Sequence, residues 1–579
     1  MKRIFYAILA LAGTLSIWTC SSGPNEKKAP DIKNQIRFNQ LGYLPGEVKK
    51  AVLTDCESSE FSLTDTAGNV VYSGKLTGRG RWDASGENVK VADFTGFDKE
   101  GNYRIYVKGI GSSASFRISP VIFDNIFHSS VKAYYIQRAS ASIEEKYAGQ
   151  FTHPLAHPDN RCFLHPSTGH KSGVISSPRG WYDAGDYNKY IVNAGYTVSM
   201  LLTLYENFPE LYPDNSNIPE SGNGISDLLD EIRYELDWAE TMQDGDGGVF
   251  FKLTSKSFCG FVRPQDDTLK RYVVGKSTSA ALNFAAMFAQ ASRVWKKYDE
   301  KLSLKYLGRS ERAWKWAIKN PAVIFRNPPD ISTGEYGHSD FRGDFFWAAA
   351  ELYATTGNPV YGNYLKSNQV SFTFVQGNSW FSYLKNLGYY SLILPESKAG
   401  QQMKDSLKSS IVGEADRQAG LLEKAPYLQP LNSFVWGSNS DILDLAVIFA
   451  QAYRITGDKK YLDAVIETVD YIFGKNATGY SFVTGYGSRP PMNPHHRLSA
   501  SDNVPEPVPG WVVGGPNGYR NDQYSEKAPY GVKYPATEPA KCYLDQTASY
   551  ASNEIAINWN APLAYITGFL VNYSASKVR

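Results

Sequence analysis

The stretch DILDLAVIFAQAYRITGDKKY, residues 441–461, decides the fold that we expect for most of the chain. Residues 441–453 are apolar at nearly every position, which predicts a helix that is buried on most sides. Gly457 then ends this helix, because glycine readily adopts the left-handed backbone that closes a helix, and the next helix begins directly after it. The stretch therefore predicts a helical hairpin with one helix at the centre of the fold.

A second stretch, AAELYATTGNPVY at residues 349–361, repeats this plan. The two copies share four residues at equivalent places: Tyr353, Thr356, Gly357 and Tyr361 in the first, and Tyr453, Thr456, Gly457 and Tyr461 in the second. Repeated helical hairpins either stack as a solenoid or close into a ring. The buried helix favours the inner layer of a double-layered barrel; the alternative is a chance likeness of two common glycine stops.

A strand region precedes the helices. From Gln35 to about Pro120, apolar and polar residues alternate and glycine-containing turns divide the segments, which predicts a small β-sandwich. Beyond Phe123 the apolar spacing becomes helical, as in residues 124–147, 190–208 and 223–243. We therefore expect the remainder of the chain to be mainly helical.

The N-terminal residues have the pattern of an export signal. Lys2 and Arg3 precede an apolar stretch that is too short to anchor a protein across a bilayer, and this stretch ends at Cys20. A cysteine followed by the polar tail SSGPNEKKAP resembles a bacterial lipoprotein site, in which Cys20 is acylated. We expect a lipid-anchored protein on the surface or the periplasmic face of an outer membrane, with ordinary secretion as the alternative. The predicted parts are a signal at 1–20, a linker at 21–34, a β-sandwich at 35–120 and a helical domain at 121–579.

The composition excludes some classes of partner. Of the 579 residues, 60 are Lys or Arg and 58 are Asp or Glu, so the net charge of +2 gives no basic field for nucleic acid or anionic lipid. A neutral partner fits this balance. Aromatic residues reach 14%, and we expect most of them in a large core and some exposed for stacking on sugars.

The other cysteines show no disulfide pattern. Cys56, Cys162, Cys259 and Cys542 are widely spaced, and a chain of this size needs no disulfide, so we expect free, buried thiols. Four histidines surround Cys162 in the sequence: His153, His157, His165 and His170. They raise the question of zinc, but their spacing lacks the pairs typical of zinc sites, and we predict no metal there.

The stretch GWYDAGDYNKY, residues 180–190, places Asp183 and Asp186 just before a helix that we expect to begin near Lys189 or Tyr190. Backbone N–H groups at a helix N-terminus stabilise negative charge. One aspartate is enough to cap a helix, which leaves the second carboxylate for another task. The Ala-Gly pair between the two aspartates allows a tight turn.

Two later segments carry further candidates. Glu554 lies in YLDQTASYASNEIAINWNAP, residues 543–562, and is either a surface residue of a helix or a carboxyl whose pKa is raised by desolvation, as suits a general acid. His495 and Arg497 end the Gly- and Pro-rich stretch SFVTGYGSRPPMNPHHR, residues 481–497. Such loop residues are candidates for binding hydroxyl groups, with a surface ion pair as the alternative for Arg497.

Together these three segments resemble glycoside hydrolase family 9, the inverting endo-β-1,4-glucanases of cellulase type. GWYDAGDYNKYIVNAG is similar to the family's nucleophilic-water motif, SFVTGYGSRPPMNPHHR to its histidine signature, and YLDQTASYASNEIAINWNA to its acid signature. NQLGY, residues 39–43, resembles the start of the immunoglobulin-like domain found in one branch. The resemblance covers nearly all of the mature chain. It implies a mainly α fold, an (α/α)6 barrel preceded by a small immunoglobulin-like β-sandwich.

The resemblance also implies a role for each matching residue. Asp186 would be the general base, Asp183 would hold the attacking water, and Glu554 would be the acid that protonates the departing oxygen. His495, Arg497 and Tyr550 would contact the sugar. An inverting enzyme needs its base and acid about 6.5 to 9.5 Å apart, so the fold must bring Glu554 across a cleft to Asp186.

This chemistry needs no cofactor, and we predict no metal in the active site. Many members of the family bind calcium, so the resemblance allows a structural calcium ion, although no EF-hand-like run is present. The stretch DGDGG at residues 244–248 is either a ligand loop or a turn, and we favour the turn.

We therefore predict an exported, lipid-anchored monomer that cleaves internal β-1,4 bonds in xyloglucan, mixed-linkage glucan or amorphous cellulose. It would bind β-glucan, no nucleic acid, and the membrane only through its lipid. One alternative is an exo-acting β-glucosidase or glucosaminidase with the same barrel. Another is a non-catalytic glycan-binding lipoprotein, against which the retention of all three carboxylates argues. The sandwich would brace the barrel, and its Trp82 is either a stacking residue or part of a core.

Overall fold

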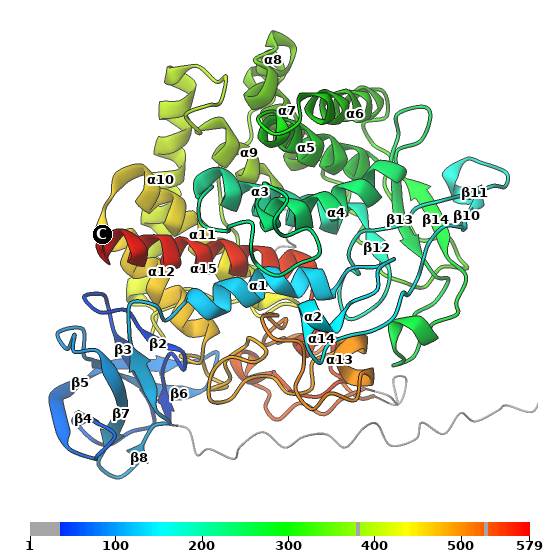
Figure 1. Cartoon of the computed structure of the whole chain (residues 1–579). Helices are drawn as coiled ribbons and strands as arrows, with labels where there is room; N and C mark the ends of the chain where they lie inside the picture. Colours follow the sequence, from blue (N-terminus) through cyan, green and yellow to red (C-terminus); the bar gives the residue numbers. More distant parts are fainter. Residues whose placement is uncertain (1–34, 378–382, 526–530, 579) are drawn as a thin grey trace, which may run out of the picture.

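The computed structural model describes residues 35–377, 383–525 and 531–578, so Cys20 and the predicted signal and linker lie outside the described residues. Within these ranges an N-terminal β-sandwich is followed by a larger helical domain (Figure 1). The last strand of the sandwich ends at Ile118 and the first helix begins at Asp124. The mainly helical fold with a small β-domain in front confirms the predicted fold class.

The sandwich is built on one long strand that serves both layers. Strand β5 pairs with β4 through its first half and with β6 through its second half, and the pairing with β6 contains a register shift between Gly78 and Gly80. The hydrogen-bonded order is β1-β3-β6-β5-β4-β7-β9-β2, with β8 on β7. The strands are β1 Ile36–Arg37, β2 Gly42–Tyr43, β3 Lys50–Thr54, β4 Glu60–Thr64, β5 Val70–Trp82, β6 Glu87–Asp93, β7 Gly101–Val107, β8 Gly111–Ser112 and β9 Phe116–Ile118.

The helical domain is a double-layered barrel, as the repeated hairpins predict. The inner helices α11, α15, α3, α5, α7 and α9 follow one another around the barrel, and each packs against the next in this order. The inner helices are α3 Ile191–Asn207, α5 Thr278–Trp295, α7 Arg342–Thr356, α9 Leu384–Leu392, α11 Ser438–Thr456 and α15 Ile557–Val578. The outer helices are α1 Asp124–Ile136, α4 Asp227–Thr241, α6 Glu300–Lys319, α8 Pro359–Ser367, α10 Gln401–Lys424 and α12 Lys459–Ile472. In Figure 1 α15 runs through the middle of the molecule beside α1.

The two copies of the hairpin stretch have the same local structure. Gly357 ends α7 and Gly457 ends α11, both in the left-handed conformation with φ values of 68° and 69°. In each copy the next residue, Asn358 or Asp458, caps the following helix through its side chain. The likeness of the two stretches is therefore a repeated supersecondary unit rather than chance.

A second sheet in the helical domain was not predicted. It has the order β11-β10-β14-β13-β12, with β10 Cys162–Leu164, β11 Val174–Ile175, β12 Lys189–Tyr190, β13 Phe250–Thr254 and β14 Tyr272–Lys276. All five residues of β13 are buried, so they lack the alternation that identifies a half-exposed strand. The prediction of helix across residues 124–147 was too long. Helix α1 ends at Ile136, and only the short helix α2, Glu145–Ala148, follows.

The sandwich packs directly on the barrel. Asn39 donates to Asp470 of α12 at 2.8 Å, and Lys50 of β3 pairs with Glu467 of the same helix at 2.9 Å. Trp82 at the end of β5 packs against Tyr427 of the barrel with 4.5 Å between ring centroids, so it is an interface residue.

The thiols of Cys162 and Cys542 are free and buried as expected, whereas Cys56 and Cys259 are half-buried. No helix in the described ranges is both long and apolar enough to cross a membrane.

Candidate active site

The two aspartates of GWYDAGDYNKY, Asp183 and Asp186, lie in the loop before β12, and they have different surroundings. Asp183 is fully buried; its carboxylate accepts hydrogen bonds from Asn193 Nδ2 at 2.7 Å and from the Tyr336 hydroxyl at 3.0 Å. Neither aspartate caps α3, because the residue before this helix is Tyr190 and its side chain makes no capping bond. The capping alternative is therefore wrong for both, and each carboxylate is available for another task.

Asp186 is the more accessible of the pair and lies on the wall of a cavity. Its Oδ2 accepts a hydrogen bond from Asn188 Nδ2 and a longer one, 3.5 Å, from the Tyr190 hydroxyl. Asn188 is itself held by Thr254 Oγ1 and the Ser255 N–H, each donating to its Oδ1 at 3.0 Å. The amide therefore fixes the direction in which Asp186 points.

Gly185, between the aspartates, is required by a close approach. A Cβ atom at this position would lie 2.2 Å from the carbonyl oxygen of His495. The Gly185 carbonyl accepts hydrogen bonds from the backbone N–H of Arg497 at 3.0 Å and from its Nη1 at 2.7 Å. Gly185 lies in a bend of the chain, and its close approach also joins the loop of the two aspartates to the loop that carries His495 and Arg497.

Glu554 lies in the extended link between α14, Tyr550–Asn553, and α15, so it is not a helix surface residue. The backbone of this link is fixed from both sides. The N–H of Ile557 donates to the Asp183 carbonyl at 2.9 Å, and the N–H of His495 donates to the Asn553 carbonyl at 2.8 Å. Three segments that are far apart in the sequence are thus hydrogen-bonded to one another.

These segments surround a cavity of about 840 Å³. Five of the six predicted enzyme-site residues line it: Asp186, His495, Arg497, Tyr550 and Glu554. Asp183 is not among the lining residues and lies buried beneath the cavity surface. Aromatic rings also line the cavity: Tyr190, Phe258, Tyr336, Trp436 and Trp559.

Two of the lining residues that sequence reasoning missed are Tyr336 and Trp436. Tyr336 lies in the loop ISTGEYG, residues 331–337, with a positive φ of 48°. No motif in the sequence marks this tyrosine as a site residue. Trp436 is 45% exposed and its ring centroid is 5.3 Å from that of Tyr550, which is the half-exposed aromatic surface that sugar stacking requires. The richness in tryptophan and tyrosine was the one signal for such residues, and it does not say which of them face a cavity.

Burial and nearby charges change the pKa values of Asp183, Asp186 and Glu554 to different degrees. Burial raises the pKa of Asp186, while the nearby Arg497 guanidinium lowers it. Burial and the charge of Asp186 hold the pKa of Glu554 well above its usual range. Burial and the same Asp186 charge raise the pKa of Asp183 as well. Arg497 lowers the pKa of both residues, but the charge of Asp186 adds to burial in raising the pKa of Glu554, so we assign the negative charge to Asp186 and the proton to Glu554.

His495 is held as a neutral imidazole. Burial and the Arg497 charge lower its pKa to about 4. Its Nδ1 lies 2.7 Å from the Thr547 carbonyl oxygen, so Nδ1 carries the ring proton and donates it to that carbonyl. Arg497 also donates from Nε to the Cys259 carbonyl at 3.1 Å, so it is fixed in the cavity wall rather than paired at the surface.

The histidines near Cys162 do not converge on a metal site. His157 contacts Asp267 at 3.2 Å, His165 contacts Asp330 at 3.1 Å, and His170 contacts Asp244 at 2.8 Å. Each of these three rings thus has an aspartate partner of its own, and Nδ1 of His153 lies 2.8 Å from the Pro154 carbonyl oxygen. Residues 244–248 form a tight turn, in which the N–H of Asp244 donates to the Gly248 carbonyl at 2.8 Å.

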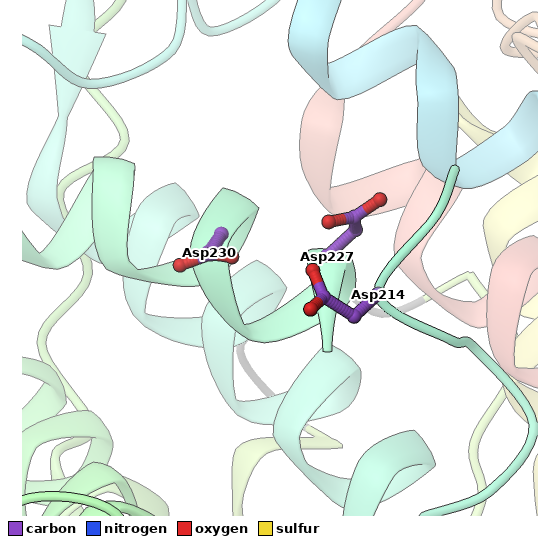
Figure 2. Close-up of side chains that lie close together, drawn as sticks. All are labelled: Asp214, Asp227 and Asp230. Atoms are coloured by element: carbon purple, nitrogen blue, oxygen red, sulfur yellow. The ribbon is translucent and has the colours of Figure 1, made fainter. Parts of the chain in front are cut away.

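A group of three aspartates lies elsewhere, at the start of α4 (Figure 2). Asp214 comes from the preceding loop, Asp227 and Asp230 from the helix, and one oxygen of each lies within 4.8 Å of the others. Burial raises the pKa of Asp227, and it raises that of Asp230 to about 7. Asp227 Oδ1 is buried without a hydrogen-bond partner in the described part of the chain. Clustered carboxylate oxygens with one atom unpartnered fit a hard cation such as Ca²⁺.

Comparison with known proteins agrees with this geometry. The sequence matches glycosyl hydrolase family 9 over residues 123–567 and the cellulase N-terminal Ig-like domain over residues 31–112. A xyloglucan-specific endo-β-1,4-glucanase of Bacteroides ovatus is 39% identical over 599 residues, covering 98% of this chain and 98% of the relative. A solved structure of a Bacteroides ovatus GH9 protein has a TM-score of 0.85 at 37% identity, covering 93% of this chain and 99% of that chain. AaCel9A in complex with cellobiose-like isofagomine has a TM-score of 0.82 at 29% identity, covering 93% and 100%.

Proposed function

The chain belongs to glycosyl hydrolase family 9 as an endo-β-1,4-glucanase, and we propose that its substrate is a soluble plant glucan, xyloglucan first among them, cleaved with inversion. One observation carries the proposal. A single cavity presents Asp186 and Glu554, whose pKa values burial raises and Arg497 lowers, next to aromatic rings. A base, an acid and a sugar-stacking surface are what an inverting glycosidase requires.

In the proposed mechanism Asp186 removes the proton from an attacking water. Asp183 helps to hold that water from beneath, with its own carboxylate fixed by Asn193 and Tyr336. Glu554 donates its proton to the glycosidic oxygen as the bond to the anomeric carbon breaks. The water adds to the opposite face of the sugar, so the anomeric configuration inverts.

The remaining lining residues bind the sugar. His495 and Arg497 stand beside Asp186 and Glu554, where an imidazole and a guanidinium can meet the hydroxyl groups of the ring that is cleaved. Trp436 and Tyr550 offer flat, half-exposed rings to a neighbouring glucose unit. The choice of xyloglucan is supported by the 39% identical relative that is specific for it. Mixed-linkage glucan and amorphous cellulose are further candidates that share the β-1,4 bond.

The site assignment is tested by reducing-sugar release from the three polymers. We expect Asp186→Asn and Glu554→Gln each to lose activity by about 100-fold or more, the usual contribution of a general acid or base. Glu414→Gln is the matched control, because Glu414 is a buried carboxylate on α10 outside the cavity. Full activity in either active-site variant would remove that residue from the mechanism.

Product analysis decides between the proposal and its alternatives. Endo action lowers the viscosity of the polymer early, whereas an exo-acting β-glucosidase releases monosaccharide first. A wild-type protein that binds the polymers but releases no reducing sugar would instead be a glycan-binding protein.

We also propose a structural calcium ion, an exported location and a monomeric state. Asp214, Asp227 and Asp230 would hold the ion as oxygen ligands, at a distance from the reaction and with no part in it.

Export and acylation at Cys20 are supported by the sequence of residues 1–20. Fractionation of cells tests them: wild type should sediment with membranes, and Cys20→Ala should not.

A further inference from the structure

We propose that Lys252, which lies behind the cavity wall, is a positioning residue that holds in place the hydrogen-bond donors of both aspartates. The inference rests on the proposed function, because it concerns how the base Asp186 and its neighbour Asp183 are oriented. Lys252 is fully buried on β13 and lies opposite Tyr190 of β12.

The ammonium group of Lys252 closes one loop of the cavity wall. Its Nζ donates to Asn327 Oδ1 at 2.7 Å, to Thr333 Oγ1 at 3.0 Å and to the Gly334 carbonyl at 2.7 Å. These three acceptors match the three N–H groups of an ammonium ion, and all belong to the loop of residues 327–337. Asn327 also donates to the Thr333 carbonyl at 2.6 Å, so the ends of the loop are joined around the lysine.

The first route from Lys252 leads to Asp183. The loop that it closes carries Tyr336, whose hydroxyl donates to Asp183 Oδ2 at 3.0 Å. The Tyr336 ring packs edge-on against Tyr190, with 4.9 Å between centroids, and the Lys252 ammonium lies 5.5 Å from the centroid of the same Tyr190 ring. Lys252 therefore fixes the position from which Tyr336 reaches the buried carboxylate.

The second route leads to Asp186. The Thr333 hydroxyl that accepts from Lys252 lies 2.8 Å from the Thr254 hydroxyl, which donates to Asn188 Oδ1 at 3.0 Å. Asn188 in turn donates to Asp186 through its Nδ2. Burial lowers the pKa of Lys252 to about 7, so its ammonium form predominates below that pH. This one buried amine is connected to Asp183 through the loop that carries Tyr336, and to Asp186 through a chain of hydrogen bonds.

A neutral side chain would not serve this arrangement equally well. Burying an ammonium group costs free energy unless all of its N–H groups are hydrogen-bonded. If Lys252 only filled space, methionine would fill the same space without that cost. Two of its partners, an amide oxygen and a carbonyl oxygen, are acceptors only, and they would be left unpaired by an apolar residue. We therefore expect Lys252 to be needed for its hydrogen bonds, which hold the loop of residues 327–337 behind Asp186.

The test is a double-mutant cycle on the full-length enzyme. We expect Lys252→Met to lower kcat on xyloglucan by about 10- to 100-fold, because a misplacement of about 1 Å near the reacting groups can cost 100-fold. KM should change by less than about threefold, since the aromatic rings that bind the sugar stay in place. Tyr336→Phe should lower kcat as well, and the double variant should lose little more than the worse single variant.

Controls separate positioning from folding. Lys404→Met removes a buried lysine of α10 that donates to the Leu394 and Pro395 carbonyls outside the cavity, so it should lower the melting temperature but not kcat. If Lys252→Met does not fold, Thr333→Val removes the shared hydroxyl and should show the same non-additivity with Tyr336→Phe. Unchanged kcat in folded Lys252→Met, or losses that multiply in the double variant, would overturn the inference. The proposed function fails separately, if wild type is inactive or Asp186→Asn is fully active.

Discussion

Asp183 and Asp186 differ in their surroundings, although only two residues separate them. Asp183 is enclosed by an amide and a phenol, whereas Asp186 faces the cavity and the charge of Arg497. Burial raises the pKa of both, but only Asp186 has the arginine among the causes that lower it. This difference supports the separate tasks that we propose for the two carboxylates, Asp186 as the base and Asp183 as the residue that helps to hold the water.

The pH profile tests this role of Arg497. Arg497 lowers the pKa of Asp186 and of Glu554, so Arg497→Gln raises both. The base then ionises only at higher pH, and the acid keeps its proton to higher pH. Both limbs of the kcat/KM profile should move to higher pH, and the maximum rate should fall. Arg342→Gln, which removes an exposed arginine, should leave the profile unchanged, and a shift of Arg497→Gln to lower pH would contradict the account.

Gly185 tests the contact between the aspartate and histidine loops. Gly185→Ala places a methyl group 2.2 Å from the His495 carbonyl oxygen, so one of the two loops must move. We expect activity to fall by about 100-fold, because the loops carry the base and the sugar-binding residues. Gly400→Ala, at a position with open space around it, is the control. Steady-state rates of the two variants check the prediction, and wild-type activity in Gly185→Ala would contradict it.

At the scale of elements, the helical hairpins could be predicted and the second sheet could not. The apolar run in α11 and the glycine stops of α7 and α11 are local features, so the sequence alone reveals them. The buried strand β13 has no alternation, and its pairing with β12 and β14 depends on residues that are far apart. The same sheet carries Lys252 and adjoins Asn188, which is why these residues escaped the sequence analysis.

The aspartates at the start of α4 make a prediction about metal removal. Dialysis against a calcium chelator should lower the melting temperature by about 2 °C or more, because a ligand bound only by the folded state stabilises it. Added Ca²⁺ should restore the value in wild type but not in Asp227→Asn. Asp340→Asn, an exposed aspartate outside the group, should respond like wild type. A wild-type melting temperature that is independent of calcium would contradict the proposed site.

At the scale of the whole molecule, the β-sandwich supports the cavity as well as the barrel. The Trp82 ring packs against Tyr427 and Phe434, with 4.5 Å and 6.0 Å between ring centroids, and the Tyr427 hydroxyl donates to Glu87 of β6 at 2.7 Å. The segment that holds Tyr427 and Phe434 continues directly to Trp436 on the cavity wall. The sandwich therefore fixes the base of a loop that faces the substrate.

Replacing Trp82 tests this connection. Trp82→Ala should reduce the free energy of unfolding by about 3 to 5 kcal/mol, the usual cost of removing a buried tryptophan. It should also raise KM for polymer more than it lowers kcat, because Trp436 loses its support while Asp186 and Glu554 do not. Val70→Ala, at an exposed position of β5, is the control. Chemical denaturation and steady-state kinetics measure both effects, and a stable variant with unchanged KM would contradict them.

The sequence identified the family and five lining residues, Asp186, His495, Arg497, Tyr550 and Glu554, because they lie in local motifs, and the comparisons confirm the family. It could not identify Tyr336, Trp436 or Lys252, since each reaches the site through contacts between distant segments. The roles of the six enzyme-site residues stay predictions until variants are assayed. The acylation of Cys20 stays a prediction in the same way.

The anomeric configuration of the first product tests the central claim most directly. Proton NMR, recorded as wild-type enzyme begins to hydrolyse xyloglucan or a cello-oligosaccharide, distinguishes the α from the β anomer before mutarotation. A water held by Asp186 and Asp183 attacks from the face opposite to Glu554, so the account predicts that the α anomer forms first. Initial formation of the β anomer would show retention of configuration and would contradict the assignment of Asp186 as a base acting on water.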